Sequence, residues 1–318
     1  AMELRAAGVT RPILLFGPLT PERVPIAIEN GLVAMVYDVR QAEALSRAAG
    51  TGKLRAHLKV DAGLSRFGLV LEGREQAALE EAKAILALPG LSVEGVFTHC
   101  TAAELPEGDW FNRRQIALFH RFCDRLADEG HPLKRHCSAS LFTALYPEAH
   151  DDFVRVASLL FGVEPTFGRG PATEPVLSLK ARLAQVKQVP AGTPVGYGPG
   201  HYTLRPTRVA VIPFGYADGL HRAVGGRMEM LVRGRRARQI GKLCMDFCML
   251  DVTDIPEAEA GDIVTLIGRD GEEEASIFDV AALYPGTATE VVTMLGRRIP
   301  RFYLRAGEIV GRHTSAVL

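Results

Sequence analysis

Short apolar runs alternate with amphipathic helical segments through the first half of the chain. Six strand–helix units can be counted, and their strands are expected at residues 12–17, 32–37, 55–61, 93–99, 133–137 and 153–156. Parallel strands need a long crossover connection, which is usually a helix. The alternation therefore predicts an α/β fold with a parallel sheet.

The count of units fits two arrangements. A doubly wound sheet would accommodate six strands, although no glycine-rich phosphate turn follows the first one. A TIM-type (β/α) barrel fits as well, although a complete barrel needs eight units. Near residues 171–175 the pattern changes to short alternating strands separated by turn glycines, which is typical of a mainly β domain. We expect one α/β domain over residues 1–170 and a β domain over residues 171–318.

Charge and cysteine content exclude several classes of partner. Lys plus Arg and Asp plus Glu both number 37, so no basic excess indicates nucleic acid or an anionic membrane as a partner. The five cysteines form no disulfide framework, which indicates a reducing compartment. We find no apolar run that could span a bilayer and no leader-like start. We therefore expect a cytoplasmic protein.

Polar side chains collect where the predicted parallel strands end. Arg66 and His99 come at the ends of the strands 55–61 and 93–99, Ser140 follows the strand 133–137, and Arg155 lies in the last strand. In a barrel, these strand ends carry the active site. Taken singly, each residue has a simpler explanation: a core histidine, an ion-pair partner or a helix cap.

Two further side chains, Lys59 and Tyr216, are candidates for chemistry. Lys59 lies between Leu58 and Val60 in a predicted strand, where a lysine that faced a barrel interior would be costly unless it were paired or modified. Alternatively, it points at the helix layer or extends to solvent. Tyr216 follows an apolar run and Gly215, which indicates a phenol at a strand-end turn. A tyrosine packed against a neighbour is the simpler alternative.

Cys244 and Cys248 have a spacing that suggests a metal site. No second pair of cysteines or histidines completes a zinc site, so we expect no bound metal. The stretch 241–251 is instead predicted to be a pair of strands joined by a tight turn.

As an ordered set, these stretches resemble the alanine racemase family, the fold-type III enzymes that use pyridoxal 5′-phosphate (PLP). The resemblance extends from Glu3 to Val310. It rests on residues 57–61 with 66–68, 97–99, His136 with Ser140, 154–155, 215–219, 244–246 and 298–303. It implies a TIM-type (β/α) barrel, with six of eight units visible, followed by a mainly β domain. It also implies racemisation of a small amino acid with PLP, most simply L-alanine to the D-alanine of peptidoglycan precursors.

The resemblance implies individual roles. Tyr216 resembles the catalytic base for the L-enantiomer, with His99 and Arg155 behind it. Arg155 is expected to face the pyridine nitrogen, and Arg66 to bond the cofactor phenolate and the substrate carboxylate. The implied phosphate cradle is Ser140 with the backbone amides near Ala157 and Ser158.

Other residues carry over to a modified side chain and to a subunit interface. Lys59 resembles a lysine that is often carbamylated in the family. Met245 and its neighbour Cys244 resemble the part of the substrate pocket that the partner subunit contributes. In the family the tyrosine also crosses the dimer interface, so a homodimer with shared active sites is implied.

Two departures from the family pattern leave alternatives open. The Schiff-base lysine of the family lies near the N-terminus on the first barrel strand, and nothing in this chain matches that motif. We expect an upstream segment to be missing or, alternatively, a catalytically inactive or PLP-binding-only relative. Thr289 occupies a position where the family usually has a tyrosine, which leaves a serine or broad-specificity racemase open. An amino-acid decarboxylase is disfavoured, because such enzymes usually place an acidic residue where Arg155 is expected.

Overall fold

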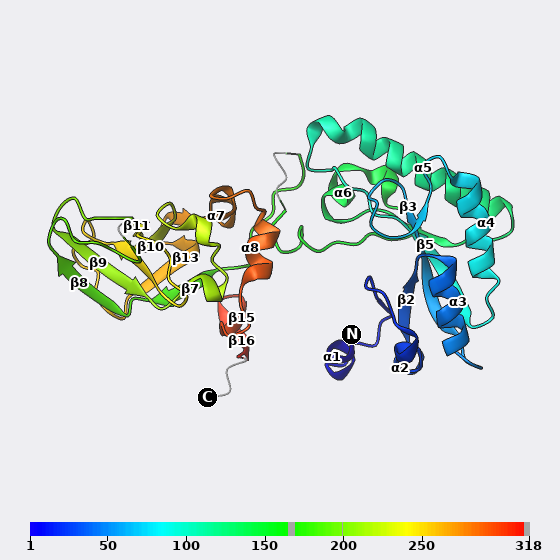
Figure 1. Ribbon diagram of the computed structural model, residues 1–318, viewed down its shortest axis with the longest axis horizontal. Coiled ribbons are helices and arrows are strands. Elements are labelled where there is room, and N and C mark those ends of the chain that lie inside the picture. The colour runs from blue at the N-terminus through cyan, green and yellow to red at the C-terminus, as the bar shows by residue number, and fades with distance from the viewer. Residues whose placement is uncertain (165–168, 199, 315–318) are drawn as a thin grey trace. The chain divides into compact units, whose positions relative to one another are not determined.

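The computed structural model describes residues 1–164, 169–198 and 200–314, and the chain divides into two compact units (Figure 1). One unit contains residues 1–157 and the other contains residues 172–314. The short stretch between them is divided, with residues 158–164 belonging to the second unit. The boundary that we predicted at residue 170 falls within this divided stretch.

The first unit is built on a parallel sheet, which confirms the predicted α/β class. Its strand order is β1-β2-β3-β5-β6, with β4 paired to β3, and the pairings are parallel. The strands are β1 (Ile13–Leu14), β2 (Leu32–Val36), β3 (Leu54–Asp61), β4 (Leu69–Val70), β5 (Leu91–Phe97) and β6 (Lys134–His136). The helices are α1 (Met2–Ala6), α2 (Val24–Glu29), α3 (Val39–Ala48), α4 (Glu75–Leu86), α5 (Asp109–Asp128) and α6 (Ser140–Leu145).

Burial explains why these segments fold as they do. All five residues of β2 are apolar and buried, as expected for a strand of a parallel sheet that is covered on both faces. On α4 the buried residues Leu79, Ala82 and Ile85 are three positions apart, so one stripe of the helix faces the core. The same cluster includes Phe119 and Phe122 of α5. The core thus lies between the sheet and its covering helices.

Two sequence predictions in this unit are wrong in detail. The strand predicted at residues 153–156 is a single parallel bridge between Ala139 and Arg155, in which the Arg155 N–H donates to the carbonyl of Ser138 (3.1 Å) and its carbonyl accepts from the Ser140 N–H (3.0 Å). β5 ends at Phe97 rather than at His99. Beyond β5, the carbonyl of Thr98 accepts a hydrogen bond from the side chain of Arg155.

The second unit is mainly antiparallel, as predicted. Its main sheet has the order β14-β13-β10-β11-β12-β9-β8, with β7 paired to β13. The strands are β7 (Leu179–Arg182), β8 (Gln185–Val189), β9 (Thr207–Ile212), β10 (Glu229–Val232), β11 (Arg235–Ile240), β12 (Cys248–Asp251), β13 (Ile263–Asp270) and β14 (Glu273–Ala275). The unit also contains α7 (Ile277–Ala282) and α8 (Ala288–Met294), which are followed by a hairpin of β15 (Arg301–Arg305) and β16 (Glu308–His313). The second helix and the hairpin were not expected from the sequence. In the part of the chain that the structure describes, no helix is both long enough and apolar enough to cross a membrane.

Candidate active site

Arg155 is the centre of a polar cluster at the ends of β5 and β6. Its guanidinium donates to the carbonyl oxygens of Thr98 (3.0 Å), His136 (3.0 Å) and Cys137 (3.1 Å), and to Nδ1 of His136 (2.8 Å). All of these acceptors are uncharged groups. Burial lowers the pKa of Arg155 to about 10, which still leaves it charged at neutral pH. The cluster therefore holds a positive charge without neutralising it.

Two histidines continue this hydrogen-bonded chain. An arginine only donates, so Nδ1 of His136 must accept, and its Nε2 must then carry the proton. That Nε2 lies 2.9 Å from Nδ1 of His57 and donates to it. Burial is the main cause that lowers the pKa of His136 to about 2, with Arg155 and His57 adding to it, so the ring is neutral. Gly95 of β5 makes room, because a Cβ there would lie 2.7 Å from the His57 ring.

His99 lies beside the same guanidinium. Its Nδ1 is 3.5 Å from Nη2 of Arg155. Burial and then the charge of Arg155 lower the pKa of His99 to about 4, so it is a neutral imidazole near pH 7. A neutral imidazole can accept a proton. The structure thus brings together His99 and Arg155, two of the residues predicted from the sequence.

Lys59 is buried in β3, with 3% of its surface exposed. Its Nζ donates to the carbonyl of Val60 (2.5 Å) and lies 5.6 Å from the ring centroid of Phe97. The alternative in which Lys59 extends to solvent is therefore wrong. Burial lowers the pKa of Lys59 to about 8, assisted by Arg155 and Arg66 and opposed by Asp61. Roughly a tenth of this amine is consequently uncharged at pH 7, far more than for an ordinary lysine.

Arg66 lies on a loop that Asp61 organises at the end of β3. The Asp61 carboxylate accepts the backbone N–H groups of Gly63 (2.8 Å) and Arg66 (3.1 Å), as well as that of the intervening Leu64 (2.8 Å). Gly68 has φ 116°, and a Cβ there would lie 2.7 Å from the carbonyl carbon of Val60, so the loop can fold back onto β3 only with glycine. The side chain of Arg66 is exposed.

Ser140 does not cap α6, as its simpler interpretation required. Ala139 is the N-cap residue, and Ser140 is the first residue of the helix. The Ser140 hydroxyl instead accepts the N–H of Ala157 (3.2 Å), so two members of the predicted phosphate cradle lie together. Ser158 belongs to the second unit, where its hydroxyl donates to the carboxylate of Glu164.

In the second unit, Tyr216 lies in a short 3-10 turn, Tyr216–Asp218, that follows β9. The turn is docked by its main chain: the Tyr216 N–H donates to the carbonyl of Cys244 (3.2 Å), and the next N–H donates to the carbonyl of Met245 (2.9 Å). A Cβ at Gly215 would lie 2.3 Å from that Met245 oxygen, so this approach requires glycine. Tyr216, Cys244 and Met245, predicted separately from the sequence, therefore form one local structure.

Arg298 ties this local structure together. Its Nε donates to Asp218 (2.6 Å) and its Nη2 donates to Asp246 (2.5 Å), while the other Asp218 oxygen accepts the Gly215 N–H (2.9 Å). The two carboxylates raise the pKa of Arg298. The sequence motif had included Arg298, but its contacts could be known only from the structure.

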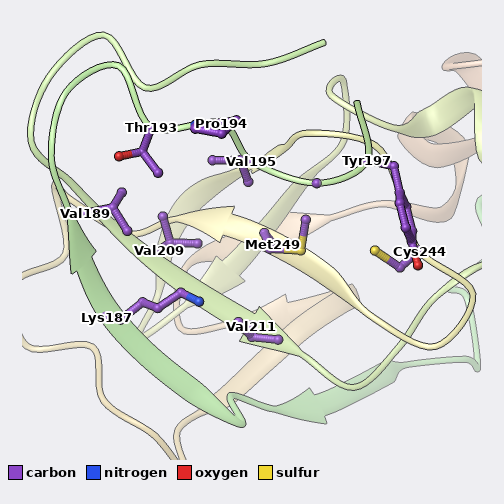
Figure 2. A pocket seen from close by; sticks show the side chains of 11 residues that line it. Lys187, Val189, Thr193, Pro194, Val195, Tyr197, Val209, Val211, Cys244 and Met249 are labelled. Carbon is purple, nitrogen blue, oxygen red and sulfur yellow. The ribbon is translucent and has the colours of Figure 1, made fainter. Parts of the chain in front are cut away.

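A cavity of about 350 Å³ opens beside this turn, and Figure 2 shows its lining. Val189 of β8, Val209 and Val211 of β9, and Met249 of β12 form apolar walls. Of the predicted site residues only Cys244 lines it, and Tyr216 does not. The cavity therefore neighbours the candidate catalytic turn without containing its phenol.

A third polar cluster, which was not predicted from the sequence, connects α5 to the end of β6 through His120, Cys137 and Asp151. Nε2 of His120 is 2.8 Å from Asp151, and the Cys137 thiol donates to the other oxygen of that carboxylate (3.2 Å). Their ligand atoms lie within 4.8 Å of one another, close enough for a metal ion. The hydrogen bond to Asp151 raises the pKa of His120 to about 9, so the pair is an ion pair. Because each group already has a partner, this network is explained without a metal.

Comparison with known families covers both units. Residues 1–165 match the family described as alanine racemase, N-terminal domain, and residues 176–303 match alanine racemase, C-terminal domain. The chain belongs to the alanine racemase family. The resemblance found in the sequence is thereby confirmed, whereas the expected loss of an upstream segment stays a prediction.

Individual alanine racemases agree with this assignment. One from Desulfosudis oleivorans is 38% identical over 314 residues, which cover 95% of this chain and 80% of that protein. One from Desulfovibrio desulfuricans is 36% identical, with coverages of 96% and 81%. The solved alanine racemase from Bacillus anthracis with bound L-Ala-P has a TM-score of 0.91 at 30% identity and covers 98% of this chain and 81% of its own. That from the D-cycloserine producer Streptomyces lavendulae has a TM-score of 0.87 at 34% identity, with coverages of 96% and 81%.

Proposed function

We propose that this protein is a PLP-dependent alanine racemase that interconverts L- and D-alanine. Membership of the family over both units supports the reaction. The observation that carries the proposal is the buried guanidinium of Arg155, which is charged and meets only neutral acceptors.

The charges of the first unit fit an anionic cofactor. Arg155 and Arg66 both lower the pKa values of Lys59 and His99, and Asp61 only partly opposes this at Lys59, so positive charge predominates around these side chains. Ser140 and the N–H of Ala157 lie next to each other and would hold the phosphate, with Ser158 following in the chain. PLP, when bound, supplies the electron sink that makes the α-proton of an amino acid removable.

Arg155 suits racemisation in particular. A guanidinium placed at the pyridine nitrogen would donate a hydrogen bond without giving up its proton, because arginine does not deprotonate in proteins. Electron withdrawal is then restrained, which favours return of the proton to the α-carbon over side reactions. An acidic residue at this position, as expected of a decarboxylase, would have the opposite effect.

Proton transfer is assigned to Tyr216 and its supporting residues. Racemisation needs a base on each face of the α-carbon, or one that can move. We assign Tyr216 as the base for L-alanine and neutral His99, beside Arg155, as the proton-accepting group behind it. Arg66 would orient the substrate carboxylate.

The surroundings of Lys59 suit a carbamylated side chain better than a charged ammonium group. Carbon dioxide adds to an uncharged amine and releases a proton, which leaves an N-carboxylate. The lowered pKa of Lys59, about 8, makes the uncharged amine available. An anion at this position would neutralise part of the charge of Arg66 and hold its side chain in place.

A homodimer with shared active sites is part of the proposal. Met245 and Phe247, beside the docked turn of Tyr216, are 54% and 48% exposed. Large apolar side chains around a catalytic phenol are expected to be covered by a partner. Cys244 and Met245 would then contribute to the substrate pocket of the second copy. The five cysteines are free thiols, which supports a cytoplasmic location.

A PLP-binding-only relative is the second candidate, because no stretch of the sequence matches the family's motif for the lysine that attaches PLP. The deciding experiment combines the visible spectrum of the protein with PLP, before and after borohydride, with intact mass and D-alanine formation. A racemase gives a borohydride-sensitive band, a covalent adduct and D-alanine. A spectrum of bound PLP with neither a covalent adduct nor D-alanine would leave only the second candidate. Comparing kcat/KM for L-alanine and L-serine tests the specificity left open by Thr289, which is exposed at the start of α8.

A further inference from the structure

The side chain of Arg222 lies over the ring of Tyr216. Its guanidinium carbon is 5.4 Å from the ring centroid. Arg222 begins a short 3-10 turn, Arg222–Val224, that is anchored on both sides: Val224 is fully buried, and the ring of His221 stacks on Tyr284 with centroids 4.5 Å apart. The backbone that carries Arg222 is therefore fixed.

Arg222 is not neutralised by a carboxylate. Within residues 1–164, 169–198 and 200–314 it takes part in no ion pair, whereas Arg298 binds both Asp218 and Asp246. The acidic groups nearest the turn are thus already occupied. The charge of Arg222 remains available to the phenol.

The other charged groups around the turn balance one another. On its own element the phenol has Asp218, and the segments packed against the turn bring Cys244, Asp246, Arg297 and Arg298. Two carboxylates and two guanidinium groups leave no net charge, so Arg222 adds a positive charge, and its guanidinium lies over the ring itself. Since a guanidinium keeps its proton, this charge persists near neutral pH.

We propose that Arg222 is a positioning residue that holds the ring of Tyr216 and favours its phenolate. A cation over the face of an aromatic ring is attracted by the ring, which orients it. An adjacent positive charge also favours the ionised form of an acid, and an unassisted phenol is almost fully protonated near neutral pH. The inference rests on the proposed role of Tyr216 as base.

The test compares Arg222→Met, which keeps length without charge, with Arg222→Lys, which keeps the charge. Arg235→Met, at an exposed position on β11, is the matched control. We expect Arg222→Met to retain PLP binding, to lose on the order of tenfold in kcat/KM at neutral pH, and to move the acid limb of the pH profile up by about one unit. Arg222→Lys should recover most of the activity, and Arg235→Met should match the unsubstituted protein.

A second measurement needs neither PLP nor turnover. Ultraviolet titration of phenolate absorbance, with Tyr216→Phe variants subtracted, isolates the ionisation of Tyr216. Arg222→Met should move that titration to higher pH, and near-ultraviolet circular dichroism should show that the fold is intact. An unchanged titration, or an unchanged acid limb, overturns the proposal. If the titration moves but the unsubstituted protein forms no D-alanine, the proposed function fails while the role of Arg222 is retained.

Discussion

The two units position their functional side chains in opposite ways. In the first unit the side chains themselves are held: the guanidinium of Arg155 is buried among carbonyls and imidazoles, and its charge is uncompensated. In the second unit the backbone is held: the turn of Tyr216 docks through N–H groups and a glycine, while Asp218 and Asp246 are paired with Arg298. Burial of charge suits a site that binds an anion. Backbone docking suits a group that must present itself to another molecule.

We expect the largest effect on activity from the substitution that removes the phenol hydroxyl from the docked turn. Tyr216→Phe keeps the backbone contacts and should reduce racemisation by roughly a thousandfold, the usual scale for loss of a general base. PLP binding should be unchanged, because the first unit holds the cofactor. D-alanine formation and PLP content are the measurements. Tyr202→Phe, at an exposed tyrosine of the same unit, is the control. Full turnover by Tyr216→Phe would show that the two units do not divide the work in this way.

Reversing the charge at position 155 in the first unit is expected to change which reaction occurs as well as its rate. A carboxyl at position 155 can share a proton with the ring nitrogen and strengthen its electron withdrawal. Arg155→Glu should therefore lower racemisation on the order of a hundredfold and raise pyruvate formation by transamination. Arg40→Glu, at an exposed position on α3, is the control. An unchanged ratio of pyruvate to D-alanine would count against the assignment of Arg155.

The pH dependence of the free energy of unfolding tests how much the burial of the charge of Lys59 destabilises the protein. Its folded pKa of about 8 is below its ordinary value of 10.5, so between these pH values the unfolded chain binds more protons than the folded one. Stability therefore rises with pH across that window and is lower below it. In buffer free of carbon dioxide, Lys59→Met should stabilise the protein without PLP by about 3 kcal/mol at pH 7 and flatten this rise.

Urea unfolding at a series of pH values measures the effect, with exposed Lys53→Met as control. A slope that persists in Lys59→Met would assign it to another group. Adding bicarbonate to the unsubstituted protein should reduce the slope as well, since a carbamate does not titrate as an amine.

The smallest expected effect concerns the histidine chain. His57→Ala leaves the Nε2–H of His136 without its acceptor, whereas His57→Asn offers an amide oxygen in its place. We expect a several-fold loss of kcat/KM for the alanine variant and a smaller loss for the asparagine variant. Nitrogen NMR of the His136 ring should show the proton on Nε2 in the unsubstituted protein. A proton on Nδ1 would contradict the assigned direction of donation.

The sequence predicts the fold well because its signals are local. An all-apolar run such as β2 and a stripe such as Leu79, Ala82 and Ile85 identify a buried strand and a covering helix without knowledge of the rest of the chain. The strand predicted at residues 153–156 failed because the main chain of Arg155 pairs at one position only. The hairpin of β15 and β16 exposes Phe302, Tyr303 and Leu304, so its strands lack the alternation of buried and exposed residues by which strands are recognised.

The candidate site was predictable where residues belong to an ordered motif, and unpredictable where they meet only in space. Lys59, His99 and Arg155 follow from the resemblance, but no spacing indicates that His120, Cys137 and Asp151 converge. Arg222 is six positions from Tyr216, so its proximity could be expected from the sequence. The sequence does not show whether its guanidinium stacks on the ring or pairs with a carboxylate. The difference depends on Arg298, far along the chain, which takes the available carboxylates.

The fixed direction of donation from Arg155 through His136 to His57 has a consequence for isotope exchange. A proton wire must be able to release a proton at one end, reorient and take one up at the other. Here one end is a guanidinium that releases none, so the chain polarises its neighbours but conducts nothing. A proton removed from substrate therefore cannot leave along this chain. Label lost to solvent during turnover must take another route, so its rate does not report on these histidines.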